Sequence, residues 1–202
     1  MRTLLTNRRI RLAMAAGVLA LLSATIGSAD RFGGQFPHTA GNWLNIGFTQ
    51  HGDYRTEVLA ATASWYVTPT CLVVFEEAID DSELDFYTEY RSETWYGHVD
   101  HYPCLGSGCS YSFANLYLNS RTLAGRSSFD KQQVAAHEFG HGIGLAHPEE
   151  YDPPDTLILS IMHQYIVDDD YNYNTPQSYD VAETNGIYLG CPAPGNRSSA
   201  RE

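Results

Sequence analysis

The feature of this chain that most constrains its fold is an eleven-residue stretch with three histidines, from His137 to His147, in the pattern H-E-x-x-H-x-x-G-x-x-H. On a helix, His137 and His141 lie one turn apart, so both imidazoles project from the same face. Gly144 permits the positive φ at which a helix ends and the chain turns back, and Pro148 prevents the helix from resuming. The spacing therefore predicts a helix, a sharp turn and a third histidine that meets the first two at one point.

Three histidines that converge in this way are a typical ligand set for zinc. Three protein ligands leave a fourth tetrahedral position for water, which is the arrangement of catalytic rather than structural zinc sites. Glu138 lies beside the ligand face, close enough to exchange a proton with that water without binding the metal. We therefore expect His137, His141 and His147 to bind Zn²⁺ and Glu138 to be a general base. A helix with solvated histidines is the alternative, and it requires the helix, glycine and proline to coincide by chance.

The helix that carries these residues has local signals of its own. Asp130 is a favourable N-cap, and Gln133 three residues later gives a start that resembles a capping box. An apolar stripe follows at helical spacing: Ala135, Phe139, Gly142 and Ile143. We expect a helix that begins after Asp130 and packs this stripe under the floor of a cleft.

The extended motif resembles that of the metzincin clan of zinc endopeptidases. The second hallmark of the clan is a turn with a methionine beneath the metal, and Ser160-Ile161-Met162-His163 matches it. The resemblance implies an α+β fold: a twisted mixed sheet with an active-site helix, a zinc cleft and this methionine turn. It also implies that Met162 supports the site without binding the metal, whereas most buried methionines only fill the core.

Other segments resemble two branches of the clan, the matrixins and the serralysins, without deciding between them. His147 to Tyr151 is similar to the serralysin continuation of the motif, and Thr175 to Tyr188 is similar to the last catalytic-domain helix of both branches. By this resemblance Asp180 would hydrogen-bond the methionine turn; an exposed acid favoured by the helix dipole is the alternative. Tyr165 stands one residue later than the tyrosine that approaches the metal in serralysins, and is a candidate for oxyanion contact or for the pocket wall.

Further metal ions are weaker expectations. Gly97-His98-Val99-Asp100 resembles the loop that carries a structural zinc in matrixins, so His98 and Asp100 are candidate ligands of a second metal. The later histidines of that site have no counterpart in residues 109–120, and a polar surface loop is the competing interpretation. The acidic run Asp168-Asp169-Asp170 is a candidate for Ca²⁺, although such runs are usually solvated loops.

The N-terminus has the pattern of a secretory signal peptide. Arginines precede an apolar run from Leu12 to Leu22, and Gly27-Ser28-Ala29 offers a small-residue cleavage site before Asp30. We expect residues 1–29 to be a signal peptide, 30–191 a single catalytic domain and 192–202 a disordered tail. Losing the four arginines of residues 1–29 takes the formal net charge from −12 to −16. Such acidity disfavours nucleic acid and anionic membranes as partners. Together with the signal peptide it fits a secreted, extracellular protein, which we expect to be a monomer.

The four cysteines favour two disulfides, because the count is even and the chain is expected to be exported. They are Cys71, Cys104, Cys109 and Cys191. Cys104 and Cys109 flank a flexible turn and are a candidate pair, which leaves the other two for each other. The alternative is a cysteine and histidine metal cluster near His98 and His101.

A sequence of strands and helices is predicted around the motif. Strands are expected at 43–48, 72–75, 84–90 and 112–119, a helix capped by Asp53 runs to Tyr66, and residues 91–110 form a long loop. By the resemblance, the strand at 112–119 lines the cleft and pairs with extended protein or peptide substrates. The resemblance implies a zinc endopeptidase; a zinc amidase on a non-protein substrate and a non-catalytic binding module stay open, although the retained Glu138 disfavours the module.

Substrate preference follows from the residues after the methionine turn, Gln164 to Val167, which by the resemblance form the wall of the pocket for the residue following the scissile bond. This wall is largely apolar, so burying an apolar side chain there stabilises binding by ~1.5–3 kcal/mol, whereas a charged one would have to be desolvated. We expect a peptide library to be cleaved mainly before Leu, Phe or Tyr. Cleavage mainly before Asp, Glu or Gly would contradict this assignment of the wall.

Overall fold

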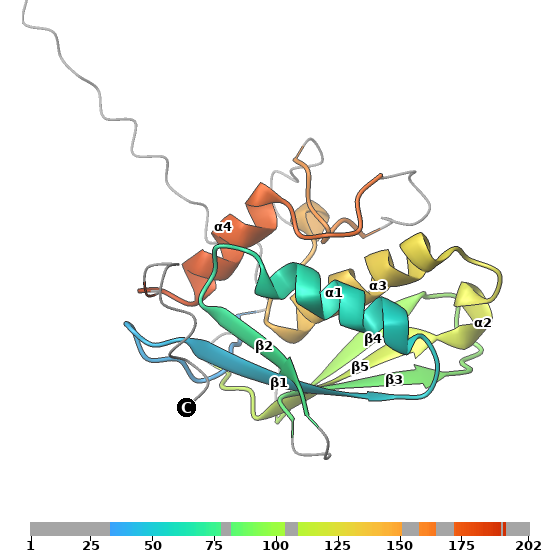
Figure 1. The fold of residues 1–202 in the computed structure, drawn as a ribbon, viewed down its shortest axis with the longest axis horizontal. Coiled ribbons are helices and arrows are strands. Elements are labelled where there is room, and N and C mark those ends of the chain that lie inside the picture. The colour runs from blue at the N-terminus through green and yellow to red at the C-terminus, as the bar shows by residue number, and fades with distance from the viewer. Residues whose placement is uncertain are drawn as a thin grey trace, which may run out of the picture.

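A five-stranded mixed sheet with helices over one face forms the framework of the protein (Figure 1). The computed structural model describes residues 33–77, 82–103, 109–150, 158–164, 172–190 and 192. The strands are β1 Leu44–His51, β2 Leu72–Glu76, β3 Leu84–Glu89, β4 Gly97–Tyr102 and β5 Phe113–Asn119. They lie in the order β2-β1-β3-β5-β4, with β4 antiparallel to β5 and the other neighbours parallel. The predicted α+β class with a mixed sheet is confirmed.

The helices of the described part of the chain are α1 Arg55–Tyr66, α2 Ser120–Leu123, α3 Ser128–Gly142 and α4 Ser178–Ile187, with a 3-10 turn, η1, at Pro148–Glu150. Figure 1 shows α1 and α3 side by side over the same face of the sheet. In the residues that the structure describes, no helix is long and apolar enough to cross a membrane. The arrangement leaves α3, which carries the histidine motif, between α1 and the β4 edge of the sheet.

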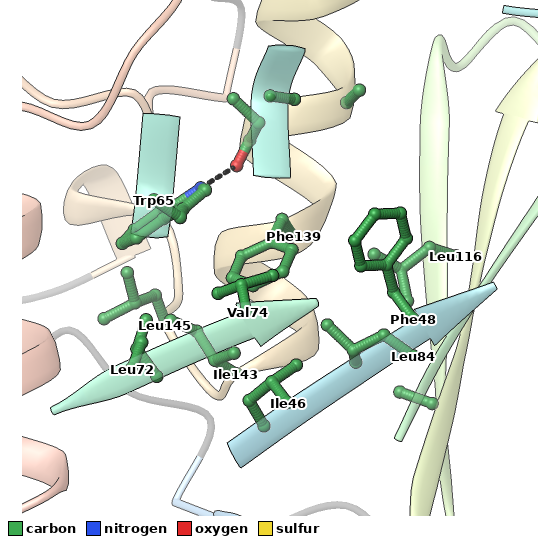
Figure 2. Close-up of a cluster of buried hydrophobic side chains, with 14 of the residues drawn as sticks. Ile46, Phe48, Trp65, Leu72, Val74, Leu84, Leu116, Phe139, Ile143 and Leu145 are labelled. Carbon is green, nitrogen blue, oxygen red and sulfur yellow. Dashed lines mark hydrogen bonds between the residues drawn. The ribbon is translucent and has the colours of Figure 1, made fainter. Parts of the chain in front are cut away.

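The core lies between the sheet and these two helices (Figure 2). Every second residue of a strand points into this core, as Ile46 and Phe48 of β1 do, because successive side chains of a strand face opposite sides of the sheet. Trp65 of α1 stacks on Phe139 of α3 with 5.6 Å between ring centroids, and its Nε1–H donates to the Ala136 carbonyl at 2.9 Å. Burial and a satisfied indole donor thus fix α3 against α1.

Strand β4 corrects the prediction of a long loop over residues 91–110. It pairs with β5 from Gly97 opposite Leu118 to Tyr102 opposite Phe113. The segment has too few aliphatic residues to show a strand alternation, and its pairing with β5 is a tertiary contact that local pattern does not reveal. As a result β4, and not the predicted strand at 112–119, is the edge of the sheet beside α3.

Both predicted helix caps are also corrected. The N-cap of α3 is Ser127, whose side chain accepts from Asp130 N at 3.2 Å, while the Asp130 carboxylate accepts from Ser127 N at 3.2 Å. Asp130 is therefore the third helical residue of a reciprocal capping box and not the cap itself. The helix α1 starts after Tyr54, which has a φ of 67° and makes no side-chain cap hydrogen bond, and not at Asp53.

Candidate metal centre

The C-terminus of α3 reverses the chain directly after His141. Gly144 has a φ of 99°, Leu145 N donates to Gly140 O at 3.0 Å, and Gly144 N donates to His141 O at 2.8 Å. These two bonds form a Schellman motif, whose left-handed position favours glycine. A Cβ at Gly144 would also lie 2.7 Å from the Gly34 carbonyl oxygen. The turn therefore requires glycine both for its conformation and for space, and it sends the chain back toward the helix.

This reversal brings the three motif histidines together. The Nε2 atom of His147 lies 3.0 Å from that of His141 and 3.2 Å from that of His137. Nitrogens bound to one zinc at 2.0–2.1 Å in a tetrahedron lie about 3.3 Å apart, so the observed spacing fits a shared metal ion. In the part of the chain that the structure describes, no other group of three or more His, Cys, Asp or Glu side chains gathers in this way.

Two of these histidines have their tautomers fixed by backbone carbonyls. His137 Nδ1 lies 2.8 Å from Ile161 O, and His141 Nδ1 lies 2.8 Å from Leu145 O. A carbonyl oxygen only accepts hydrogen bonds, so each Nδ1 carries the proton. Each Nε2 then has a free lone pair directed at the shared point, as metal ligation requires.

Burial keeps the same histidines neutral. Both are buried, and desolvation lowers the pKa of His137 to about 3. Desolvation, together with the neighbouring motif histidines, lowers the pKa of His141 well below its ordinary value. Because a protonated imidazole cannot bind a metal, this environment holds the ligands in the binding form at neutral pH.

Glu138 lies next to the histidine cluster and faces strand β4. Its side chain is buried, which raises the pKa of the carboxyl to about 8. Its Oε2 atom has no hydrogen-bond partner among the described residues, so it is available to a water or substrate. A Cβ added to Gly97 of β4 would collide with the Glu138 carboxylate. The strand can pass this close to Glu138 only because residue 97 is a glycine.

The methionine turn lies beneath the histidines and contacts α3 between them. Met162 is buried, and its Sδ fills the space that a Cβ at Gly140 would occupy. The preceding residue, Ile161, supplies the carbonyl that fixes His137. The turn thus packs against the helix and also orients one ligand.

Asp180 of α4 holds the methionine turn in place. Its carboxylate accepts hydrogen bonds from Ser160 Oγ at 2.5 Å and Ile161 N at 2.9 Å, and from Gln177 N at 2.6 Å. Burial raises the pKa of Asp180, and these three hydrogen bonds act against that rise. A carboxylate that accepts three hydrogen bonds is well stabilised despite its burial. Asp180 is thus buried and hydrogen-bonded to the methionine turn, not exposed.

The structure also brings His101 to this site, although the sequence predicts no role for it there. Its Nε2 donates to the His141 carbonyl at 2.9 Å, and burial is the main cause that lowers its pKa. His101 therefore attaches strand β4 to the ligand-bearing end of α3. The signal was not visible in the sequence, because it depends on β4 being the strand beside that helix.

His98 and Asp100 do not join the cluster. They lie on β4 with exposed side chains, 53% and 46% accessible, and His98 Nε2 is 3.1 Å from Asp100 Oδ1. No third ligand joins them within the described part of the chain, so we propose no second metal there.

Several other predicted features involve residues that lie outside the described ones. These are Tyr165, the apolar wall at Ile166 and Val167, the calcium candidate at 168–170, residues 1–29, and the cysteines at 104 and 191. Neither Cys71 nor Cys109 is a free cysteine. Their pairing stays a prediction.

Comparisons with known proteins find distant similarities. No known family profile matches the chain. Stromelysin-3 from Xenopus laevis is 28% identical over 155 residues, which are 69% of this chain, and the match spans only 28% of that protein's length. Among solved structures, High choriolytic enzyme 1, a hatching enzyme zinc-protease from Oryzias latipes, aligns with a TM-score of 0.49 at 13% identity, covering 78% of this chain and 94% of that one. Myroilysin aligns with a TM-score of 0.45 at 13% identity, covering 76% and 95%.

The purified protein should hold one zinc ion per chain. His137→Ala removes one of three converging ligands and should lose most of the metal, as measured by elemental analysis after gel filtration. His51→Ala, which removes a histidine on β1 away from the cluster, is the control and should keep its zinc. Full occupancy in His137→Ala would show that the metal binds elsewhere.

Proposed function

We propose that this member of the metzincin clan is a zinc-dependent endopeptidase that hydrolyses peptide bonds in extended protein or peptide segments. One observation carries the proposal: three histidines converge through Nε2 at 3.0 and 3.2 Å, with a buried carboxyl, Glu138, beside them and an edge strand facing it. The chain corresponds to a small part of its curated relative, so substrates and partners belong to this proposal as well.

The residues fit zinc and leave room for a reacting group. Three imidazole nitrogens, two of them on rings with fixed tautomers, are a donor set that suits zinc, and zinc held by three protein ligands would keep one position for water. Zinc bound there would polarise a water molecule and the scissile carbonyl and would lower the pKa of nearby acids. Glu138, with Oε2 unpartnered among the described residues, would take the proton from the attacking water and deliver it to the departing amine.

Strand β4 supports a peptide as the substrate. It is the last strand in the sheet order, so one of its edges has no neighbouring strand among the described residues. An extended peptide can add to such an edge through backbone hydrogen bonds. Gly97 of β4 contacts Glu138, so a peptide paired with this edge would pass beside the proposed general base. This favours peptide hydrolysis over action on a small, compact amide.

The other two function classes make different demands. A zinc amidase would use the same ligands and base but would not need the edge of β4. A binding module would need no general base, whereas Glu138 is present and buried beside the cluster. Hydrolysis of a denatured protein such as casein that a chelator abolishes and zinc restores supports the endopeptidase. Hydrolysis confined to non-protein amides, or none at all by the zinc-loaded protein, would overturn it.

We further propose that the enzyme is secreted and works outside the cell. The predicted signal peptide supports this, and so does the finding that neither described cysteine is a free thiol. The acidic composition, with a formal net charge of −12 over the whole chain, makes nucleic acid an unfavourable partner. We retain the expectation of a monomer.

Glu138→Ala tests the assignment of the base. The variant keeps all three histidines, so it should bind zinc at wild-type stoichiometry while its hydrolysis of casein falls by ~10²–10⁴-fold. Glu89→Ala removes a partly exposed acid at the end of β3 and should retain full activity. Wild-type turnover in Glu138→Ala would mean that another group activates the water.

Gly97→Ala tests whether β4 and Glu138 must approach each other. The added methyl group would displace the carboxylate, and a shift of about 1 Å in a reacting group can cost about 10²-fold in rate. We expect kcat to fall while zinc content stays unchanged. Gly47→Ala is a matched control, since a Cβ at Gly47 would also meet a carboxylate, that of Glu77. Gly47 lies on β1, which β3 and β5 separate from β4 in the sheet. Equal kcat values for Gly97→Ala and wild type would contradict this requirement.

A further inference from the structure

His163, the residue after Met162, makes a short polar contact with Glu149. Its side chain is 1% exposed and that of Glu149 is 26% exposed. His163 Nδ1 lies 2.5 Å from Glu149 Oε1, and Nε2 lies 2.7 Å from the Ile158 carbonyl oxygen. The sequence alone predicts no role for His163, because a histidine in a turn is usually a surface residue.

Both ring nitrogens of His163 make a polar contact. A carbonyl oxygen only accepts hydrogen bonds, so Nε2 donates to Ile158, and Nδ1 is left to face the Glu149 carboxyl group. A polar pair withdrawn from water in this way often stabilises a fold no more than hydrophobic residues of similar volume would. The pair therefore calls for an explanation beyond general stability.

Its place in the chain offers that explanation. Glu149 belongs to η1 and stands two residues after His147, while His163 stands directly after Met162. The pair consequently joins the segment that carries the third ligand to the methionine turn. His137 and His141 lie on the helix α3, whereas His147 lies five residues beyond its end, between the turn at Gly144 and η1. The contact of Glu149 with His163 adds a constraint from the methionine turn on the segment that keeps His147 at 3.0 and 3.2 Å from the other two histidines.

We propose that His163 and Glu149 are positioning residues that hold the His147 segment against the methionine turn and so slow the loss of zinc. The inference rests on the proposed zinc site. The contact acts through the positions of two backbone segments. Glu149 belongs to η1, directly after His147, and His163 belongs to the methionine turn, whose Ile161 carbonyl orients His137. Loosening the pair should free the third ligand and weaken the metal site, although neither residue touches the metal.

The test is the rate at which zinc leaves the folded, zinc-loaded protein when excess chelator is added. We compare wild type, Glu149→Ala, His163→Gln and the double variant, with Glu76→Ala as the control. Glu76 makes an ion pair with Arg55 at 2.6 Å on the surface, so its loss matches the loss of an acidic partner without touching the site. Outer ligand supports typically change metal affinity by ~10–100-fold, and we expect zinc release to accelerate by that factor in both single variants.

The double variant distinguishes a pair from two independent effects. If the two side chains act through each other, it should release zinc no faster than the more affected single variant. Replacement of zinc by Co²⁺ adds a spectroscopic readout, since visible absorption reports how the three histidines surround the metal. It should change in Glu149→Ala and not in Glu76→Ala. Glu149 is partly exposed, so Glu149→Ala should fold even if His163→Gln does not, and circular dichroism checks this.

Release of zinc from folded Glu149→Ala at the wild-type rate, with an unchanged Co²⁺ spectrum, would overturn the inference while leaving the proposed function intact. Additive acceleration in the double variant would also overturn it, because the residues would then act separately. Failure of the proposed function has a different signature: the wild-type protein itself would bind no zinc or would hydrolyse no peptide.

Discussion

The site depends on hydrogen bonds between ligand imidazoles and backbone carbonyls. His137 and His141 each donate from Nδ1 to a carbonyl oxygen at 2.8 Å, and this leaves both Nε2 lone pairs free to face one point. Each carbonyl belongs to a turn that is itself fixed. Leu145 is part of the Schellman motif that ends α3, and Ile161 is part of the methionine turn that Asp180 holds from α4. The turns around α3 therefore orient the Nε2 atoms of His137 and His141.

The sheet contributes the other side of the proposed cleft. Strand β4 is attached to α3 by the hydrogen bond from His101 to the His141 carbonyl, and Gly97 gives Glu138 the space that any other residue would fill. The same strand leaves an edge without a neighbouring strand among the described residues. Strand β4 thus contacts the proposed base and also provides the edge along which a peptide backbone would lie. Residues far from the histidine motif therefore contribute to the proposed site.

The residues that sequence predicted best are those whose role follows from local spacing. The histidines, Gly144 and Pro148 lie within twelve positions, and helix geometry alone brings them together. Features that need a distant partner were predicted less well. The sequence predicts a loop where β4 lies, because the pairing of β4 with β5 is a tertiary contact. The support from His101 and from the His163–Glu149 pair likewise depends on which segments become neighbours. The cap of α3 was misplaced by three residues, since Ser127 and Asp130 both suit a capping box and only the backbone decides which is the cap.

The central claim is that one zinc ion is bound by the Nε2 atoms of three histidines. Extended X-ray absorption fine structure at the zinc K-edge of the purified protein measures this directly. The account predicts a first shell of three imidazole nitrogens at about 2.0–2.1 Å with one oxygen completing a tetrahedron. Sulfur in the first shell at about 2.3 Å, or fewer than three imidazoles in the multiple-scattering pattern, would contradict it.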